Sequence, residues 1–422
     1  MSRPGSVLRC ALSLALVVGL WSMLDQSCRA QTPGASASGT ARKPAAAPKA
    51  REGERIEMRS QHFFIHTDMS EAETKDLLER LEYMLGIISA YWERQPQGII
   101  ECYVVKDIKN WPAGSIPDES GRASIESGGG LTVSRVIPSL GKGTSIVYAG
   151  ADRGTPQHEA VHAYCATNFG TTGPVWYSEG MAEMGQYWRK GETAVQIHPG
   201  VVKYIRDSEP KTLNEIVNGN ERTGDSWQNY AWRWALCHLL ASNPNYSPNF
   251  RPLGLGILHQ KPVSFEQTYG AMANEISFEY LFFLKHLCNG YRMDLCYWDW
   301  KRKFSGLANG PGRTMTVQAA RGWQPTGILV RAENEYTVKA TGTWKLEKKA
   351  TKGVTADGDS TGEGKLIGII FNEFQLSEEF DIGADGSFKP PMDGQLHVRC
   401  KSDWASIGDN VGSVQVKIAN KP

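Results

Sequence analysis

The chain has 422 residues, of which 41% are hydrophobic and 22% are charged, a normal composition for soluble globular domains. It is longer than one ordinary domain, so two folded units with flexible tails are expected. The formal net charge is +1, from 46 basic and 45 acidic residues, and this balance argues against nucleic acid or an anionic membrane surface as a partner.

The N-terminus has the layout of a secretion signal. Arg3 and Arg9 precede an uncharged, largely apolar run over residues 10–24, and Ala30 is a small residue suited to a cleavage site. The apolar run is short for a membrane-spanning helix, although a retained anchor is the alternative. We therefore expect a signal peptide over residues 1–30 and a protein that is secreted, periplasmic or held at the cell surface. No stable membrane span is expected after cleavage.

Residues 31–55 are rich in Ala, Pro, Ser and Lys and nearly free of large apolar side chains, which predicts a flexible tether. Two of the eight cysteines lie in the expected signal peptide, and the rest are too few for a disulfide scaffold in a chain of this length. Cys288 and Cys296 are close enough in sequence to bridge across a short turn. Cys165 and Cys237 lie in apolar helical contexts that are typical of buried free thiols.

Strands and helices alternate in the first part of the ordered chain. Ser70 and Glu73 have the spacing of a capping box, and they precede a helical repeat of apolar residues that runs from Leu77 to Trp92. The Gly/Ser-rich stretch 120–130 lacks the pattern of a phosphate-binding loop and is interpreted as a surface excursion. Strands are predicted at residues 61–67, 98–106 and 144–149.

The middle of the chain is mostly helical and the last quarter is mostly strand. Residues 309–312, Asn-Gly-Pro-Gly, separate the two parts. Helices are predicted at 157–168, 176–189, 226–241 and 277–288. Beyond the break, a period of two predicts strands at 328–330, 336–338, 365–370, 395–400 and 413–418. The expected fold is an α+β domain over residues 56–308, followed by an all-β sandwich over residues 315–420.

The segment His158-Glu159-Ala160-Val161-His162 has the spacing of a zinc-binding helix. Two histidines four residues apart project from one face of a helix, so their imidazoles can converge on one ion. Glu159 points toward the open side of such a metal, where it can act as general base toward a water molecule. Catalytic zinc takes three protein ligands, so a third must come from elsewhere in the fold.

The best candidate for the third ligand is Glu179, in the run Trp176-Tyr177-Ser178-Glu179-Gly180-Met181-Ala182-Glu183. This run predicts a turn and a helix that packs antiparallel against the metal helix. Glu183 lies one helical turn later on the same face. It is the alternative ligand, but it is better placed to orient a ligand histidine.

These two motifs resemble those of the gluzincin metallopeptidases, the group that includes thermolysin-like and aminopeptidase N-like enzymes. More closely, residues 62–238 are similar to an uncharacterised gluzincin-like family of exported bacterial proteins. The resemblance implies a zincin-like domain that holds Zn²⁺ through His158, His162 and Glu179, with Glu159 as general base. The resemblance does not indicate a particular substrate, and a peptide or protein is the expected class. The aminopeptidase motif that grips a free amino terminus is not evident upstream, which favours an endopeptidase.

A gluzincin usually also supplies a Tyr or His that stabilises the oxyanion of the reaction. Tyr230, in the run Asn229-Tyr230-Ala231-Trp232, is the candidate for this role in the present chain. The alternative is that Tyr230 is a packed aromatic residue on an apolar helix.

The stretch from Trp323 to Ile418 resembles the PA-I type galactophilic lectins of bacteria. In those lectins a loop carboxylate and a pair of Asx residues before a glycine hold Ca²⁺, which binds sugar hydroxyls, and Asp409 and Asn410 match that pair. The upstream carboxylate is out of register, because Ser402 occupies its place. Turn residues are the alternative for Asp409 and Asn410. The likeness is carried by the segments at 323–328, 340–344, 364–368, 386–388, 393–396 and 408–412.

Three functions are left open by the sequence. The leading one is a secreted zinc-dependent peptidase with an appended module for a galactose-like glycan or another surface. The second is a non-catalytic glycan- or surface-binding protein with a degenerate zincin domain. The third is a protein in which zinc has only a structural role, although a structural site would not need Glu159.

Overall fold

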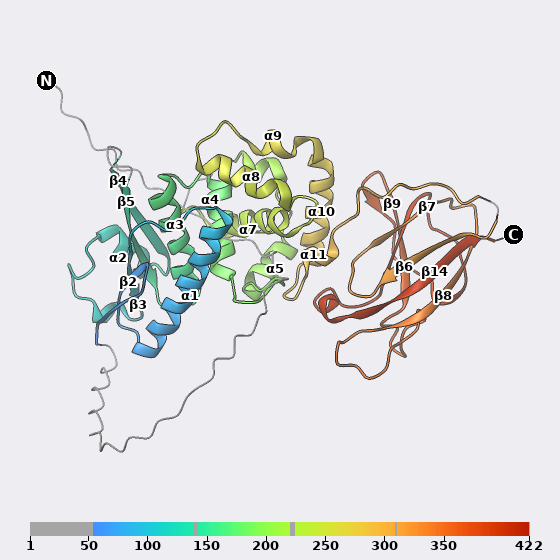
Figure 1. Ribbon diagram of the computed structural model, residues 1–422, viewed down its shortest axis with the longest axis horizontal. Coiled ribbons are helices and arrows are strands. Elements are labelled where there is room, and N and C mark those ends of the chain that lie inside the picture. Colours follow the sequence, from blue (N-terminus) through green and yellow to red (C-terminus); the bar gives the residue numbers. More distant parts are fainter. Residues whose placement is uncertain (1–53, 138–141, 220–223, 309, 422) are drawn as a thin grey trace, which may run out of the picture.

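The computed structural model describes residues 54–137, 142–219, 224–308 and 310–421 (Figure 1). The expected signal peptide and all but the last two residues of the expected tether lie outside the described residues. A helical domain with one sheet lies on the left of Figure 1, and a β-sandwich lies on the right. Within the described residues, no helix is long and apolar enough to span a membrane.

The first domain is built on a five-stranded mixed sheet with the order β1-β2-β3-β5-β4. The central strands β2, β3 and β5 are parallel, and β1 and β4 are antiparallel additions at the two edges. The strand bounds are β1 Ile56–Arg59, β2 Phe63–Thr67, β3 Ile100–Val105, β4 Gly130–Ile137 and β5 Lys142–Gly150.

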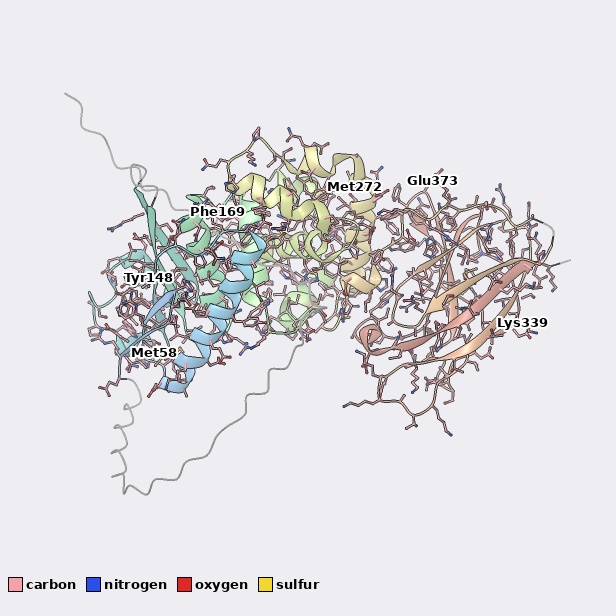
Figure 2. The ribbon with its side chains drawn as sticks, in the orientation of Figure 1. Met58, Tyr148, Phe169, Met272, Lys339 and Glu373 are labelled. Atoms are coloured by element: carbon pink, nitrogen blue, oxygen red, sulfur yellow. The ribbon has the colours of Figure 1, made fainter. Side chains whose placement is uncertain are left out.

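Helices cover both faces of this sheet. The helix α1 (Glu71–Tyr91) begins at the predicted capping box of Ser70 and Glu73, and it packs with α3 (Thr155–Phe169) over one face. The short helix α2 (Glu119–Glu126) packs against β4 and β5 in a separate apolar cluster that includes Tyr148, labelled in Figure 2. The expected surface excursion at 120–130 is therefore wrong, because this stretch forms most of α2 and the start of β4.

The rest of the first domain is helical. The long helix α7 packs on α4, and α8 and α10 pack on α7. The helix bounds are α4 Val175–Tyr187, α5 Pro199–Asp207, α6 Leu213–Val217, α7 Trp227–Ser242, α8 Ser247–Leu258, α9 Phe265–Tyr269, α10 Ala273–His286 and α11 Met293–Cys296. The six described cysteines are all free thiols. The bridge considered between Cys288 and Cys296 is not formed, because α11 turns Cys296 into the core while Cys288 stays half-buried.

The C-terminal part consists of two antiparallel sheets packed face to face. One has the order β10-β9-β13-β7, with β11 also paired to β9, and the other has the order β12-β8-β14-β6. Apolar residues from both sheets form the core between them. The strand bounds are β6 Arg313–Gln318, β7 Gln324–Val330, β8 Tyr336–Lys345, β9 Leu366–Asn372, β10 Gln375–Leu376, β11 Phe380–Asp381, β12 Asp385–Phe388, β13 Gly394–Cys400 and β14 Val411–Asn420.

The two sheets of the sandwich differ in their burial patterns. In β14 buried and exposed residues alternate, as expected of a strand with one face in water. In β9 the first six residues are all buried, because the outer face of this sheet is covered by the helical domain. Its Ile367, Ile369 and Phe371 pack with Phe282, which lies in α10, and with Trp298, which follows α11.

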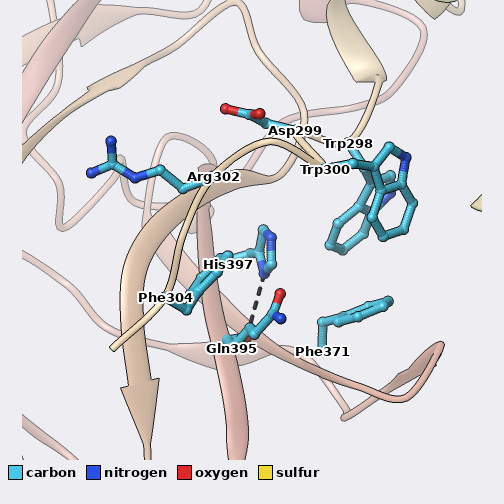
Figure 3. A pocket seen from close by; sticks show the side chains of 8 residues that line it. All are labelled: Trp298, Asp299, Trp300, Arg302, Phe304, Phe371, Gln395 and His397. Atoms are coloured by element: carbon cyan, nitrogen blue, oxygen red, sulfur yellow. Dashed lines mark hydrogen bonds between the residues drawn. The ribbon is translucent and has the colours of Figure 1, made fainter. Parts of the chain in front are cut away.

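The junction between the two domains is aromatic and closely packed. Trp298 packs against Phe371 and His397 of the sandwich, with ring centroids 5.7 and 4.6 Å away, and the three side chains line a cavity of about 80 Å³ (Figure 3). Nδ1 of His397 lies 3.3 Å from the carbonyl oxygen of Gln395 (Figure 3). Burial lowers the pKa of His397 to about 3, so this imidazole is neutral at the junction.

Two further contacts extend the junction on either side. Ser305, which precedes the sandwich in sequence, pairs with Ile328 of β7, so the sandwich effectively begins before residue 308. The loop after β13 carries Trp404 and Ile407 into the core of the helical domain. The guanidinium of Arg399 lies 3.9 Å from the ring centroid of Trp404, and this cation–π contact stabilises the loop.

Candidate metal centre

The helix α3 lies almost wholly inside the first domain. All residues from Pro156 to Asn168 are buried, because α3 is covered by β4 and β5 on one side and by α4 on the other. It begins after Gly154, with Pro156 in its first turn, and ends at Gly170 in the left-handed conformation. His158 and His162 therefore project from one face into the interior, with ring centroids 4.6 Å apart.

The helix α4 brings two carboxylates against this pair. Glu179 is fully buried, and Glu183 lies one turn further along with 5% of its surface exposed. A Cβ at Gly180 would lie 2.5 Å from the carbonyl oxygen of Arg233 and 2.7 Å from the Sγ of Cys237. Glycine at this position thus allows α4 to pack tightly between α3 and α7, which places the Glu179 carboxylate beside the two imidazoles.

The distances among these groups suit a tetrahedral metal. Oε2 of Glu179 lies 3.4 Å from Nε2 of His158 and 3.7 Å from Nε2 of His162. Two ligand atoms bound to one zinc ion at about 2.0–2.1 Å in a tetrahedron are roughly 3.4 Å apart. Neither ring nitrogen of His162 has a hydrogen-bond partner in the described part of the chain, although both are buried. Buried polar atoms of this kind need a partner, and a metal ion would supply one.

His158, Glu159 and His162 form a second possible set of metal ligands. His158, Glu159 and His162 offer ligand atoms that all lie within 4.8 Å of one another. We prefer Glu179 to Glu159 as the third ligand, because Glu179 is within tetrahedral reach of both imidazoles while Glu159 is hydrogen-bonded elsewhere. The residues thus fit a zinc ion held by His158, His162 and Glu179.

Glu183 supports this cluster from outside. Its Oε1 lies 3.1 Å from Nδ1 of His158, the ring nitrogen that faces away from Glu179. This contact is the carboxylate–histidine arrangement that fixes the orientation of a metal-ligating imidazole. Burial alone would lower the pKa of His158, but the carboxylates of Glu179 and Glu183 raise it well above its usual range. His162 has no such second carboxylate, so burial and the charge of His158 lower its pKa.

Glu159 faces the edge strand β4. The hydroxyl of Thr132 lies 2.7 Å from Oε2 of Glu159 and 2.9 Å from its main-chain carbonyl oxygen. A Cβ at Gly130 would lie 2.7 Å from both Cγ and Oε1 of the same side chain. Burial raises the pKa of Glu159 to about 7, although the charge of His158 and the hydrogen bond from Thr132 lower it.

Sequence reasoning missed the contribution of Gly130 and Thr132. Both lie at or just beyond the end of the stretch interpreted as a surface excursion. The signal that could have found them is the alternation of Leu131 and Val133 with Thr132 and Ser134, which is typical of a strand. Thr132 and Ser134 face α3 and are buried, so the polar residues of this strand point inward.

Tyr230 lies in the first turn of α7, beside the metal-ligand cluster. Its ring centroid is 6.0 Å from that of His158, and its hydroxyl oxygen accepts a hydrogen bond of 2.8 Å from the amide of Gly224. Burial and the charge of Glu179 raise its pKa, so the hydroxyl stays protonated and able to donate. The structure thus brings Tyr230 to the cluster that holds His158, Glu159, His162, Glu179 and Glu183.

Asp409 and Asn410 lie far away in the sandwich, at the end of the loop that docks on the helical domain. Asn410 is buried, and its Nδ2 donates to the carbonyl oxygen of Ala319 at 3.1 Å and to Oγ of Ser402 at 2.9 Å. Asp409 is half-exposed, with Nζ of Lys348 3.9 Å from its Oδ1. Within the described residues, neither belongs to a group of three His, Cys, Asp or Glu side chains within metal-binding reach. The Asn410 amide is used for packing, and calcium at this pair stays a prediction.

Comparison with known proteins finds a likeness among solved structures. No model of a known protein family matches the sequence, and no curated protein matches it. Among solved structures, the chain is similar to the EclA N-terminal domain, described as a PllA-like lectin. The identity is 17% over 26% of this chain and 96% of that chain, with a TM-score of 0.23. The likeness is too slight to assign a ligand to the sandwich.

Proposed function

We propose that this chain is a zinc-dependent peptidase whose metal is held by His158, His162 and Glu179. The observation that carries the proposal is the convergence of Nε2 of both histidines on Oε2 of Glu179, at 3.4 and 3.7 Å. A merely structural zinc site would have no use for Glu159, which lies beside this cluster with its carboxylate held by Thr132.

The chemistry follows from the residues around that cluster. Zinc, when bound there, acts as a Lewis acid toward water and toward a substrate carbonyl. The Glu159 carboxylate accepts a proton from the attacking water and passes it to the nitrogen of the departing amine. The hydrogen bond from Thr132 to Oε2 fixes this carboxylate, which leaves Oε1 for the proton. Tyr230 is the proposed donor to the oxyanion that forms at the substrate carbonyl.

The edge strand β4 is suited to hold an extended peptide. Among the described residues, β4 pairs with β5 alone, so its other edge has backbone groups to offer a further strand. Gly130 lies at the point where β4 approaches Glu159. A peptide added to this edge would pass the catalytic carboxylate without needing a free amino terminus, so we favour an endopeptidase.

The location and the sandwich complete the proposal. The charged start and apolar run of the N-terminus suit export, so we propose action outside the cytoplasm, by a secreted, periplasmic or surface-held protein. We propose that the sandwich binds a galactose-like glycan or another surface feature, on the strength of its sequence segments. The alternative is that glycan or surface binding is the main activity and the zincin-like domain is degenerate.

The test is metal content and peptide cleavage of the purified full chain beside two variants. Glu159→Gln should keep one zinc per chain and lose cleavage of a mixed peptide library. His162→Ala should lose both zinc and cleavage. Zinc in the parent without cleavage of casein or any library peptide would favour the binding alternative. A parent that takes up no zinc would overturn the assignment of the site.

A further inference from the structure

A groove of about 970 Å³ adjoins the proposed metal centre. Its lining comes from the loop just before α3, the end of α4, the segment from Arg189 to the start of α5, and the first residue of α7. Gly154 in its wall lies one helical turn before His158. Gln186, also in the wall, donates a hydrogen bond of 3.4 Å to Glu183. The groove is thus linked to the proposed centre through Gly154 and Gln186.

Two arginines in the groove wall have no acidic partner among the residues that the structure describes. Arg189 donates to the carbonyl oxygens of Gln186 and Trp188, at 3.0 and 2.7 Å. Arg153 is exposed, and among the described residues neither arginine forms an ion pair with a carboxylate. Burial lowers the pKa of Arg189, and the charges of Arg153 and Arg80 lower it further. The groove lining thus contains two guanidinium groups.

The two carboxylates in the groove wall are already used by the backbone. Oδ1 of Asp152 accepts hydrogen bonds from the amides of Gly154 and Thr155, at 2.7 and 2.8 Å. Oε1 of Glu192 accepts from the amides of Thr193 and Ala194, both at 2.9 Å. These carboxylates brace the loops before α3 and after α4, and their amide partners offset part of their negative charge. Among the described residues, neither carboxylate forms an ion pair with Arg153 or Arg189.

The groove also has apolar lining residues. Trp227 is 51% exposed at the start of α7, and Ile197 and Val201 lie near the start of α5. A side chain with a short aliphatic stem and an anionic end matches this combination of surfaces. Guanidinium groups bind carboxylates through two parallel hydrogen bonds, and such charge-assisted bonds are among the stronger ones in proteins.

We propose that Arg153 and Arg189 form a specificity subsite for an acidic side chain of a peptide substrate. The inference rests on the proposed peptidase function and adds the substrate class, which is a peptide with an internal Asp or Glu near the bond that is cut. A free carboxyl terminus offers the same carboxylate chemistry, so the experiment must separate the two sources.

The experiment compares peptide pairs that differ only by Glu or Gln at one position, scanned along an otherwise constant sequence with an amidated C-terminus. The parent should cleave the Glu peptide with the higher kcat/KM at one position. Arg153→Gln combined with Arg189→Gln should reduce that preference by about tenfold or more, while cleavage of the Gln peptide stays close to that of the parent. The matched control is Lys190→Gln, which removes a neighbouring charge that lies over the Tyr83 ring.

Further arms keep the test decisive. Arg153 is exposed, so Arg153→Glu alone should weaken the preference even if the double variant does not fold. Free-acid Gln peptides that outcompete amidated Glu peptides would overturn the assignment to a side chain. Cleavage by the parent with no difference between Glu and Gln would overturn the subsite and leave the peptidase intact.

A binding arm separates the two proposals. Glu159→Gln should bind a fluorescent Glu peptide more tightly than its Gln counterpart, and adding the two arginine substitutions should abolish the difference. If that binding pattern is found but the parent cleaves no peptide, the anionic subsite stands and the peptidase proposal fails.

Discussion

Nδ1 of His158 lies 3.1 Å from Oε1 of Glu183, on the side of the imidazole opposite Glu179. The imidazole is thus held between two carboxylates from one helix, and only one of them is within reach of His162. This relationship separates the roles of two glutamates that sequence spacing alone placed on the same helical face.

Glu183→Gln should weaken zinc binding by about 10–100-fold, because the amide orients the imidazole less strongly than the carboxylate does. The measurement is zinc affinity by competition with a chromogenic chelator. Glu126→Gln, an exposed glutamate on α2, is the control and should bind zinc as the parent does. An unchanged affinity in Glu183→Gln would show that the contact with His158 does not support the metal.

Thr132→Val should lower kcat by about tenfold, because it removes the hydroxyl that fixes the Glu159 carboxylate at 2.7 Å. Zinc content should stay at the parent level, since Thr132 does not contact the metal ligands. Thr132→Ser keeps the hydroxyl and should retain most of the activity. Equal rates for the Val and Ser variants would contradict a positioning role for this residue.

Gly180→Ala should destabilise the protein by about 1–3 kcal/mol, because the added methyl group meets the backbone of Arg233 in the neighbouring helix. The control is Gly86→Ala in the middle of α1, where nothing lies within 4 Å of the new Cβ. That change should stabilise by about 0.5–1 kcal/mol. Urea unfolding of both variants measures the difference, and equal stabilities would argue against close packing of α4 on α7.

Asp68→Asn should destabilise the protein in a way that depends on pH. Asp68 follows β2, and its two carboxylate oxygens accept hydrogen bonds from the amides of Lys106 and Asp107 and from Asn110, at 2.6 to 2.9 Å. Burial alone would raise its pKa, but these hydrogen bonds hold the pKa below the ordinary value of 3.8. The charged form is therefore the one that folding favours.

A lowered pKa means that the stabilisation is present above the unfolded-state pKa and is lost as pH falls through the folded-state pKa. The difference in free energy of unfolding between parent and Asp68→Asn should be about 1–3 kcal/mol at pH 7. It should shrink as the pH falls below about 3.9. Asp385→Asn, at an exposed aspartate in β12, should show little difference at any pH. A constant difference for Asp68→Asn across the range would contradict the role of its charge.

The sequence allowed the convergence of His158, His162 and Glu179 to be predicted, because helical spacing determines its local geometry. His158 and His162 share a face of α3 through the four-residue interval alone, and Glu179 follows from a second helix close in the chain. The predicted helices at 157–168 and 226–241 differ from α3 and α7 by one or two residues at each end. Helices of this kind can be predicted locally, because the spacing of their apolar residues follows the helical period.

The elements that were missed depend on contacts between distant segments. The Gly/Ser-rich composition of 120–130 indicated a loop, but Asp118 caps α2 through the amides of Ser120 and Gly121. A Cβ at Gly121 would overlap the Tyr148 ring, so glycine here serves helix–sheet packing. The groove with Arg153 and Arg189 joins segments of three helices, and no local pattern marks it.

The aromatic junction joins the sandwich to the helical domain that contains the proposed metal centre. Oε1 of Glu279 in α10 accepts a hydrogen bond of 2.7 Å from Nε1 of Trp300, and Oε2 accepts one of 3.1 Å from the amide of Trp298. The segment between the domains is thereby fastened to the helical side while Trp298 packs on the sandwich. If the sandwich binds a feature of the substrate, as proposed, this packing sets the distance between that feature and Glu159. The spacing between an anchored feature and a cut bond would then be a property of this packing, open to measurement on substrates of graded length.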